Sequence, residues 1–199
     1  MRYSTEQKRE MRAAMLSAMG RGLRKNGFAG SGVDDLARRA GVTSGAIYSQ
    51  FGSKQAVFLA ALEAGLDQLA ATIPDYQNRH GAGWVWAFAG HYLGRAHRED
   101  LEGGCVMAAL TGDVVRAGEE AHRLMEDKMQ HIAALAARGL KGGSEAERLA
   151  RAWALISLLA GGLNLTRAMQ RPEPVQALAE SLIEAAVQAA GPARDVSGG

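Results

Sequence analysis

Proline and cysteine are scarce in this 199-residue sequence, and its N-terminus has no apolar run of the kind found in a signal peptide. With only four prolines, abundant Ala and Leu and no runs of alternating β-branched residues, it predicts an all-α protein. The single cysteine, Cys105, cannot form an intramolecular disulfide, so we expect a reducing cytoplasm. A hydrophobic content of 47% excludes disorder of the whole chain.

Long apolar stretches and clustered metal ligands are also lacking. The longest apolar stretch, residues 152–165, is shorter than the roughly 20 residues of a membrane span. It predicts a buried helix and no membrane partner. The histidines are scattered, and the sequence has no phosphate-binding glycine loop and no nucleophile elbow. We therefore expect no metal, no cofactor and no enzymatic activity.

The charges, although nearly balanced overall, are unevenly distributed. Residues 1–56 hold 10 Lys and Arg against 4 Asp and Glu, a net charge of +6. Residues 57–199 hold 13 against 17, a net charge of −4. This asymmetry favours a polyanion as partner of the front third. A solvated basic surface without a partner is the alternative, and charge alone does not decide between the two.

Capping and breaking residues delimit the first helices. A capping box of Ser4 and Gln7 precedes the first helix, which ends at Asn26–Gly27. A short second helix starts at Ser31 or Gly32.

The second helix is followed closely by a third. Gly41 stops the second helix, and Thr43 or Ser44 caps the next one, which runs to about Phe51. Two short helices joined by a tight glycine turn predict a helix-turn-helix. A long amphipathic helix follows and is expected to end at Pro74.

The remainder of the chain is expected to be helical as well. Ser144 and Glu147 form a second capping box. About nine helices are predicted in all, those after the polar stretch 74–83 lying near residues 84–98, 105–117, 119–139, 145–169 and 174–190.

Residues 27–54 read GFAGSGVDDLARRAGVTSGAIYSQFGSK, with Gly-aromatic, Ala-Gly-Val, Ile-Tyr, Phe and Ser-Lys elements in order. This stretch resembles the DNA-binding signature of the TetR family of bacterial transcriptional regulators. The resemblance implies a helix-turn-helix DNA-binding domain at 1–56 and a helical effector-binding and dimerisation domain at 57–199. Gly32 departs from the usual Thr or Ser, and Ser49 and Gln50 replace bulkier residues, so base preference does not carry over from the family.

The predicted DNA contacts lie in and around the third helix, which would enter a major groove. By resemblance, Tyr48 and Lys54 are phosphate clamps, and Gln50 suits a bidentate contact with adenine. Arg38 and Arg39 are either an electrostatic grip on DNA or ordinary surface charges. The predicted set is Ser31, Arg38, Arg39, Thr43, Ser44, Gly45, Ala46, Tyr48, Ser49, Gln50 and Lys54.

Aromatic and methionine side chains in the second part suit a pocket for an apolar or aromatic effector, although the same spacing is more often typical of a plain core. The predicted ligand-binding residues are Trp86, His91, Tyr92, Cys105, Met125, Met129, Trp153 and Asn164.

Cys105 supports an alternative. It follows two glycines and is expected to open a helix, where the helix dipole would favour the thiolate. Some members of the TetR family carry a cysteine at a similar position and sense electrophiles or oxidants, so the resemblance allows a thiol-based sensor. A cysteine packed as a small hydrophobe is the simpler interpretation. A thiol enzyme and a helical interaction module without DNA are the remaining alternatives.

The last two predicted helices are apolar enough to pack against a second copy. By resemblance they form a four-helix interface in a homodimer, and the alternative is that both belong to the core of one chain. The residues predicted for this interface are Trp153, Leu159, Leu163, Val175, Leu178, Leu182 and Ala186. The expected partners are thus a double-stranded DNA operator, a second copy of the chain and an unidentified small-molecule effector. Repression is expected, with activation as the alternative.

Overall fold

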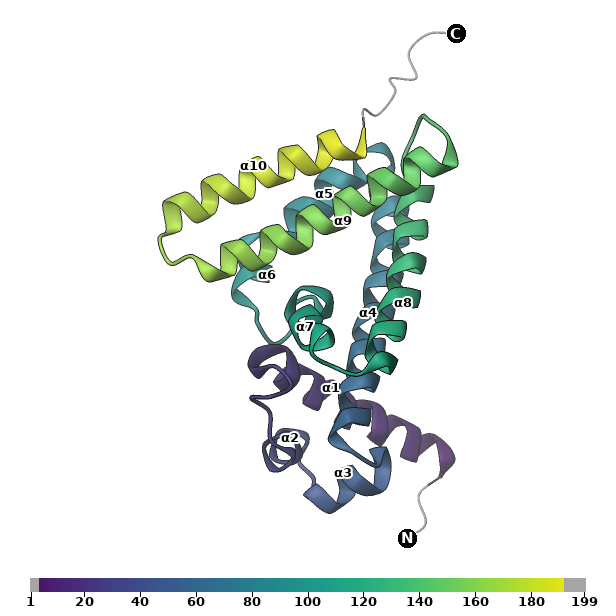
Figure 1. Ribbon diagram of the computed structural model, residues 1–199, viewed down its shortest axis with the longest axis vertical. Coiled ribbons are helices and arrows are strands. Elements are labelled where there is room, and N and C mark those ends of the chain that lie inside the picture. Colours follow the sequence, from purple (N-terminus) through teal and green to yellow (C-terminus); the bar gives the residue numbers. More distant parts are fainter. Residues whose placement is uncertain (1–3, 192–199) are drawn as a thin grey trace. The chain divides into compact units, whose positions relative to one another are not determined.

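The computed structural model describes residues 4–191, and in this range the chain is helical without any strand (Figure 1). Nine α-helices of eight residues or more, the five-residue α6 (Arg95–Glu99) and one short 3-10 helix, η1 (Gly81–Gly83), make up the described part. The expected all-α fold with about nine helices is confirmed.

The helices form two compact units, which are described separately. One contains the described residues up to Leu66 together with Leu101–Glu126; the other contains Asp67–Asp100 and the described residues from Asp127 onward. The first unit holds α1 (Thr5–Asn26), α2 (Val33–Ala40), α3 (Ser44–Phe51), the first part of α4 (Lys54–His80), α7 (Val106–Val115) and the start of α8 (Glu119–Arg138). The second holds the rest of α4 and α8, α5 (Trp84–Tyr92), α6, η1, α9 (Glu145–Ala168) and α10 (Pro172–Ala190).

Both predicted capping boxes are present. At the start of α1, the Ser4 hydroxyl accepts from the backbone N–H of Gln7 over 3.1 Å, and the Gln7 side chain accepts from the Ser4 N–H over 2.9 Å. Ser144 and Glu147 repeat the arrangement at the start of α9. Hydrogen bonds from the Ser144 backbone and hydroxyl also lower the pKa of the Glu147 carboxyl. Each box satisfies backbone donors that a helix start otherwise leaves open.

The helix-turn-helix is built around a buried cluster and one glycine. Leu23 of α1, Leu36 of α2 and Ile47 of α3 are fully buried, and α2 packs against both α1 and α3. Gly41 has a left-handed backbone, with φ of +67°, and its N–H donates to the Arg38 carbonyl over 3.2 Å. A side chain at this position would be strained, so the tight turn between α2 and α3 needs glycine here.

The expected end of the fourth helix at Pro74 is wrong. Helix α4 continues through Pro74 for six more residues. The missing N–H of proline costs one backbone hydrogen bond, but the residues that follow Pro74 are held by contacts with other helices. The Tyr76 ring packs edge-on against Phe88 at 5.4 Å, and the Gln77 amide donates to the Leu135 carbonyl of α8 over 2.9 Å.

The single helix expected at 84–98 is two helices, α5 and α6, separated at Leu93–Gly94. A Cβ on Gly94 would lie 2.7 Å from the Gly90 carbonyl oxygen, so only glycine allows this bend. The end of α6 is then held by Arg167 of α9. Its guanidinium donates to the backbone carbonyls of His97 and Arg98 over 2.9 and 3.1 Å.

Helices α9 and α10 lie side by side in the second unit (Figure 1). They approach closely at Gly162, where a Cβ would lie 2.5 Å from the Leu182 side chain. Leu159 and Leu163 of α9 and Ala186 of α10 are buried between the helices of this unit. The two helices are therefore one packed layer.

Two stretches, Lys54–Tyr92 and Glu145–Ala168, are long and apolar enough to cross a membrane by length and composition alone. The second stretch contains residues 152–165, the apolar run that is by itself shorter than a membrane span. In each stretch 39% of the most apolar window is buried inside the structure. A core helix of a soluble protein passes the same test, so this finding is weak evidence for a membrane span.

Candidate nucleic-acid interface

Helix α3 separates its buried residues from its exposed ones. Ile47 and Phe51 face the core, whereas Gly45, Tyr48 and Ser49 are exposed, Tyr48 with 51% of its surface accessible. Successive residues are 100° apart on a helix, which puts Gly45 and Ser49 opposite the buried pair. Small residues at the centre of this face allow a close approach, and Tyr48 flanks them.

The start of α3 is fixed by its own hydroxyl groups. Thr43 accepts from the Ala46 N–H over 3.2 Å, and Ser44 donates to the Asp34 carboxylate of α2. Both side chains therefore hold the helix-turn-helix together. Their predicted roles in DNA contact stay predictions, with Thr43 the more exposed of the two.

Ser31 lies elsewhere than expected. It is completely buried, and its hydroxyl donates to the Gly27 carbonyl at the end of α1 over 2.8 Å. No atom of Ser31 is exposed to reach a phosphate in this structure. The role it has here is to satisfy a carbonyl at a helix end.

Arg38 and Arg39 are paired with carboxylates. Asp35 accepts from Arg38 over 2.5 Å and from Arg39 over 3.4 Å, and the hydrogen bond from Arg38 is the main reason that the pKa of the Asp35 carboxyl is lowered. Arg39 also contacts Glu102 over 3.3 Å. Their positive charges are thus partly offset by two carboxylates within the first unit.

Glu102 ties the segment before α7 to the helix-turn-helix, a role that sequence reasoning missed. Its carboxylate accepts from Lys25 over 2.9 Å and from Arg39, and its backbone carbonyl accepts from Arg24 Nε over 2.5 Å. The hydrogen bond from Lys25 is the largest cause that lowers the pKa of the Glu102 carboxyl. Because Lys25 lies 77 residues away in sequence, no local pattern points to this cluster.

Two cations beside α3 lie over aromatic rings. The Lys54 ammonium lies 4.2 Å from the centre of the Phe28 ring, and the Arg12 guanidinium lies 4.5 Å from the centre of the Phe51 ring. Lys54 is the first residue of α4, where Ser53 accepts from the Ala56 N–H over 3.0 Å. Neither cation is paired with a carboxylate of the described residues.

The residues predicted to bind an effector fall in both units. Cys105 and Met125 belong to the first unit, and the other six to the second. In the second unit His91 stacks on His97 with ring centres 5.7 Å apart, and Tyr92 contacts His97 at 4.9 Å. Burial lowers the pKa of His97, whose Nδ1 donates to the Tyr92 carbonyl over 2.6 Å.

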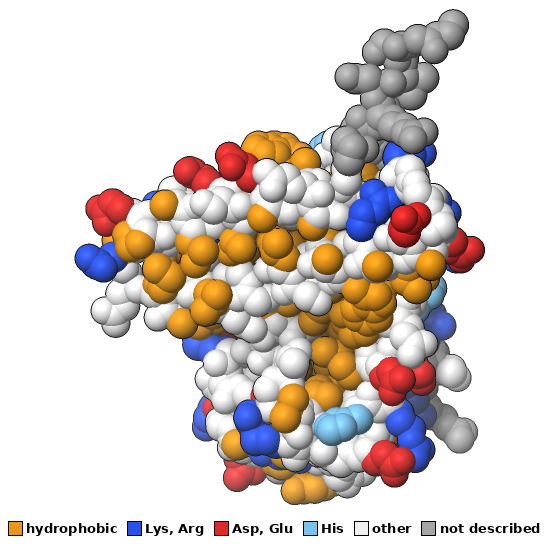
Figure 2. Space-filling view, turned by 45° about the horizontal axis from the view of Figure 1, so that its top comes forward, with side chains coloured by type: hydrophobic (Ala, Val, Ile, Leu, Met, Phe, Trp, Pro, Cys, Tyr) orange, Lys and Arg blue, Asp and Glu red, His pale blue; other side chains and the backbone are white. Residues whose placement is uncertain are grey.

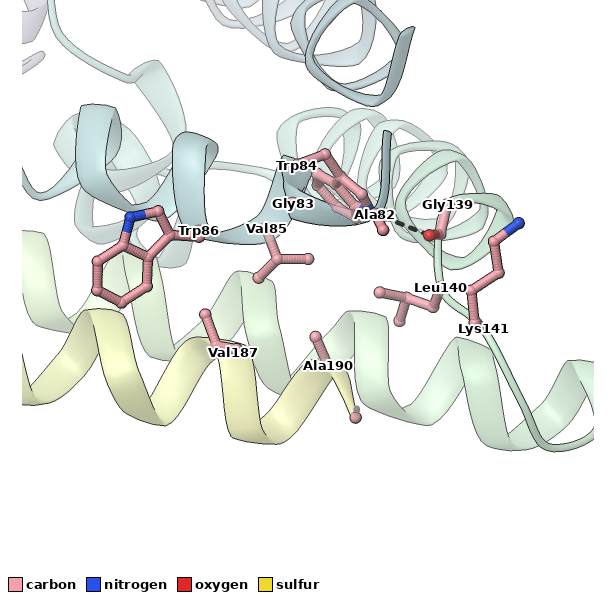
Figure 3. A pocket seen from close by; sticks show the side chains of 11 residues that line it. Ala82, Gly83, Trp84, Val85, Trp86, Gly139, Leu140, Lys141, Val187 and Ala190 are labelled. Atoms are coloured by element: carbon pink, nitrogen blue, oxygen red, sulfur yellow. Dashed lines mark hydrogen bonds between the residues drawn. The ribbon is translucent and has the colours of Figure 1, made fainter. Parts of the chain in front are cut away.

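A small pocket of about 110 Å³ lies between the start of α5, the end of α8 and the end of α10 (Figure 3). Val85, Leu140 and Val187 form its apolar wall, with Lys141 at one end and Trp86 at the other. Of the six predicted effector residues in the second unit, Trp86 alone lines this pocket, and 59% of its surface is accessible. The other five do not line the pocket, and two of them, Tyr92 and Met129, are buried.

Cys105 is the N-cap residue of α7, as the sequence predicted, and it is half-buried. It forms no disulfide. Among the described residues no group of three or more His, Cys, Asp and Glu is arranged to hold a metal ion.

The residues predicted for a dimer interface divide into two groups. Leu159, Leu163 and Ala186 are buried within the second unit and are unavailable to a partner. The others, which are partly exposed, are Trp153, Val175, Leu178 and Leu182. Figure 2 shows apolar side chains gathered along this part of the surface.

Sequence reasoning missed the most exposed apolar residue of α9. Leu165 has 59% of its surface accessible and lies four residues beyond the exposed Gly161. This spacing is the available signal, because residues four apart share one helix face. Gly161 has nothing within 4 Å of an added Cβ, so the surface is open there.

An exposed polar helix on a helix-turn-helix frame, with unpaired cations beside it, is the arrangement found in helix-turn-helix DNA-binding proteins. Residues 21–61 match the profile of bacterial regulatory proteins of the tetR family. Residues 21–61 are therefore similar to the TetR family, and the chain has the fold seen in solved TetR-family transcriptional regulators. A search of curated protein sequences finds no match.

Solved structures agree with this fold over nearly the whole chain. A TetR-family regulator from Cytophaga hutchinsonii is 16% identical, with a TM-score of 0.76 over 94% of this chain and 97% of its own. One from Streptomyces coelicolor is 19% identical, with a TM-score of 0.74 over 92% and 95%. The reduced form of NemR from E. coli is 20% identical, with a TM-score of 0.72 over 87% and 95%.

Proposed function

We propose that the chain is a transcriptional regulator that binds a palindromic operator as a homodimer in the cytoplasm and represses transcription. The observation that carries the proposal is the exposed face of α3, where Gly45 and Ser49 lie opposite the buried core residues and Tyr48 flanks them. Its small centre suits insertion into a major groove, and Gln50 remains exposed for base contact.

The apolar face of α9 and α10 supports the dimer. Leu165 is exposed on α9, and Trp153 of α9 and Leu178 of α10 are only half-buried. Contiguous exposed apolar surface is typical of an interaction site, and a twofold dimer is the commonest assembly that covers one. Two heads related by a twofold axis match the two halves of a palindrome.

A gel shift with DNA flanking the gene for this protein tests DNA binding. We expect a discrete complex that excess unlabelled flanking DNA removes and unrelated DNA does not. A chain that shifts neither DNA, even at low salt, contradicts the proposal. A complex that unlabelled DNA of any sequence removes equally well would contradict binding to a specific operator. The protein would then bind DNA without sequence preference.

We further propose that a small apolar or aromatic effector binds the second unit and releases the operator. Release requires that the effector bind the DNA-incompetent conformation of the protein more tightly than the DNA-competent one. The pocket between α5, α8 and α10, with Val85, Leu140 and Val187 in its wall and Trp86 at one end, supports an apolar ligand. Quenching of Trp fluorescence by a panel of aromatic compounds, measured with release of labelled operator, tests this proposal. Compounds that bind without release contradict it.

A thiol sensor at Cys105 is the second candidate. Its half-buried position at the start of α7 favours it, because a partly accessible thiol can be reached by an electrophile. A thiol-reactive electrophile should then release operator DNA from the wild type and leave Cys105→Ser bound. Equal release from both proteins contradicts the sensor.

A further inference from the structure

The cations of the first unit differ in how far their charge is available to a polyanion. Arg9 is paired with Glu6 over 2.7 Å, Arg38 with Asp35, and Lys25 with Glu102. An ion pair with a neighbouring carboxylate offsets the charge that a phosphate would otherwise attract. A basic composition therefore overstates the number of residues that contact DNA.

Arg12 is an exposed cation that lacks such a partner. It makes no ion pair or side-chain hydrogen bond with another described residue. Its guanidinium lies over the ring of Phe51, 4.5 Å from the ring centre. The ring covers one face of the guanidinium, while the five N–H donors lie in its plane and stay available. Phe51 thus limits where the side chain points without using its donors.

The contact with Phe51 places the Arg12 side chain at the end of α3, because Phe51 is the last residue of that helix. A major groove is about 12 Å wide, close to the 10 to 12 Å diameter of a helix with its side chains. A side chain packed against the end of an inserted helix therefore lies near the phosphates that border the groove. Figure 1 shows the N-terminal part of α1, which carries Arg12, beside α3.

We propose that Arg12 is a phosphate-contacting residue, held against the end of α3 by Phe51, and that it provides the electrostatic grip that sequence reasoning assigned to Arg38 and Arg39. The inference rests on the proposed DNA-binding function. Arg12 on Phe51 and Lys54 on Phe28 form two equivalent arrangements, each an unpaired cation held by an aromatic ring of the helix-turn-helix frame.

The test measures how the affinity of the full-length protein for its flanking DNA depends on salt. Arg12→Met keeps an unbranched stem over Phe51 and removes the charge. Each phosphate contact contributes about 0.9 to the slope of log affinity against log salt. We expect the slope to fall by about 1.8 for a dimer with two heads, and the low-salt affinity to fall roughly tenfold or more.

Two controls separate this role from a general loss of charge or stability. Arg9→Met removes one charge from the same helix, but a paired one, and should leave the slope nearly unchanged. Arg12→Lys keeps the charge and should retain most of the slope. Thermal melting of each variant verifies that the helix-turn-helix is folded.

The outcomes distinguish this inference from the function on which it rests. Wild-type protein that binds no DNA overturns both. Wild-type protein that binds DNA, with Arg12→Met folded and its slope unchanged, overturns the inference alone. Equal losses in Arg9→Met and Arg12→Met also overturn it, since only net charge would then matter.

Discussion

The exposed side of α3 and the face formed by α9 and α10 are both open surfaces, but they differ in kind. The exposed side of α3 is polar, has the small residues Gly45 and Ser49 at its centre and is bordered by unpaired cations. The second is apolar and carries no motif. Contact with DNA restricts which residue stands at each position, whereas helix association needs only apolar side chains at the right spacing. A short motif therefore identifies the first surface, and only accessibility reveals the second.

The largest effect is expected from a charge on the apolar face. Leu165→Asp should give a folded monomer, and operator affinity should fall by about 100-fold or more because each head then binds its half-site alone. Sedimentation and a gel shift measure the two effects. Val115→Asp, at another exposed apolar residue, is the matched control. A dimeric Leu165→Asp protein would show that this face is not the interface.

Loss of the clamp residues should be the next largest effect on DNA binding. Lys54→Ala is expected to weaken binding to all sequences and to lower the salt slope by about 1.8 for the dimer. Tyr48→Phe should weaken binding to every sequence through the loss of one hydroxyl. Titrations at several salt concentrations measure both. An affinity that is unchanged across salt would remove the clamp assignment.

A change in sequence preference is expected from Gln50→Ala. If Gln50 contacts adenine through two hydrogen bonds, the cognate base loses about 1 to 3 kcal/mol at one position in each half-site. Binding to a set of single-base operator variants measures the preference. The same base profile in wild type and variant would exclude Gln50 from base readout.

A smaller effect should follow from Glu102→Gln. The substitution removes one negative charge from the helix-turn-helix unit of each chain. Lys25 and Arg39 then lose their ion pairs with the Glu102 carboxylate. Non-specific DNA binding should therefore strengthen at low salt, and the difference should vanish at high salt, where exposed charges are screened. The matched control is Glu99→Gln, whose carboxylate pairs with Arg95 in the other unit. Identical binding by wild type and Glu102→Gln would contradict this role.

The smallest effect concerns pH and the second unit. Burial lowers the pKa of His97 more than its hydrogen bond to Tyr92 raises it. The unfolded chain therefore binds this proton at higher pH than the folded chain, and the free energy of unfolding should fall as the pH drops below about 6.5. Urea unfolding at pH 7.5 and 5.5 should show a larger loss for wild type than for His97→Gln. The same loss in both proteins would contradict the assignment, and His131→Gln, at an exposed histidine, is the control.

Local signals in the sequence predicted much of the fold. The capping boxes at Ser4 and Ser144 and the glycine turn at Gly41 were sufficient to place helix starts and the helix-turn-helix. Pro74 was misleading because contacts from distant helices keep α4 regular beyond it. Local signals fail where tertiary packing decides.

The site was less predictable than the fold, for the same reason. Asp35 pairs with Arg38 at a three-residue helical spacing, a local signal that the prediction of Arg38 as a DNA contact did not use. Arg12 was not singled out, because its contact with Phe51 joins residues far apart in sequence. Likewise, the buried Leu163 and the exposed Leu165 belong to one apolar run, whose composition alone does not show which side of the helix faces the core.

A footprint of the full-length protein on the DNA flanking its gene tests the central claim most directly. The account predicts protection of one palindromic site with two half-sites whose centres lie about one helical turn, or a multiple of it, apart. Titration should show two chains or a multiple of two on that site, and Lys54→Ala should lose the protection at a salt concentration where wild type retains it. Protection without twofold symmetry, or none at any protein concentration, would contradict the account.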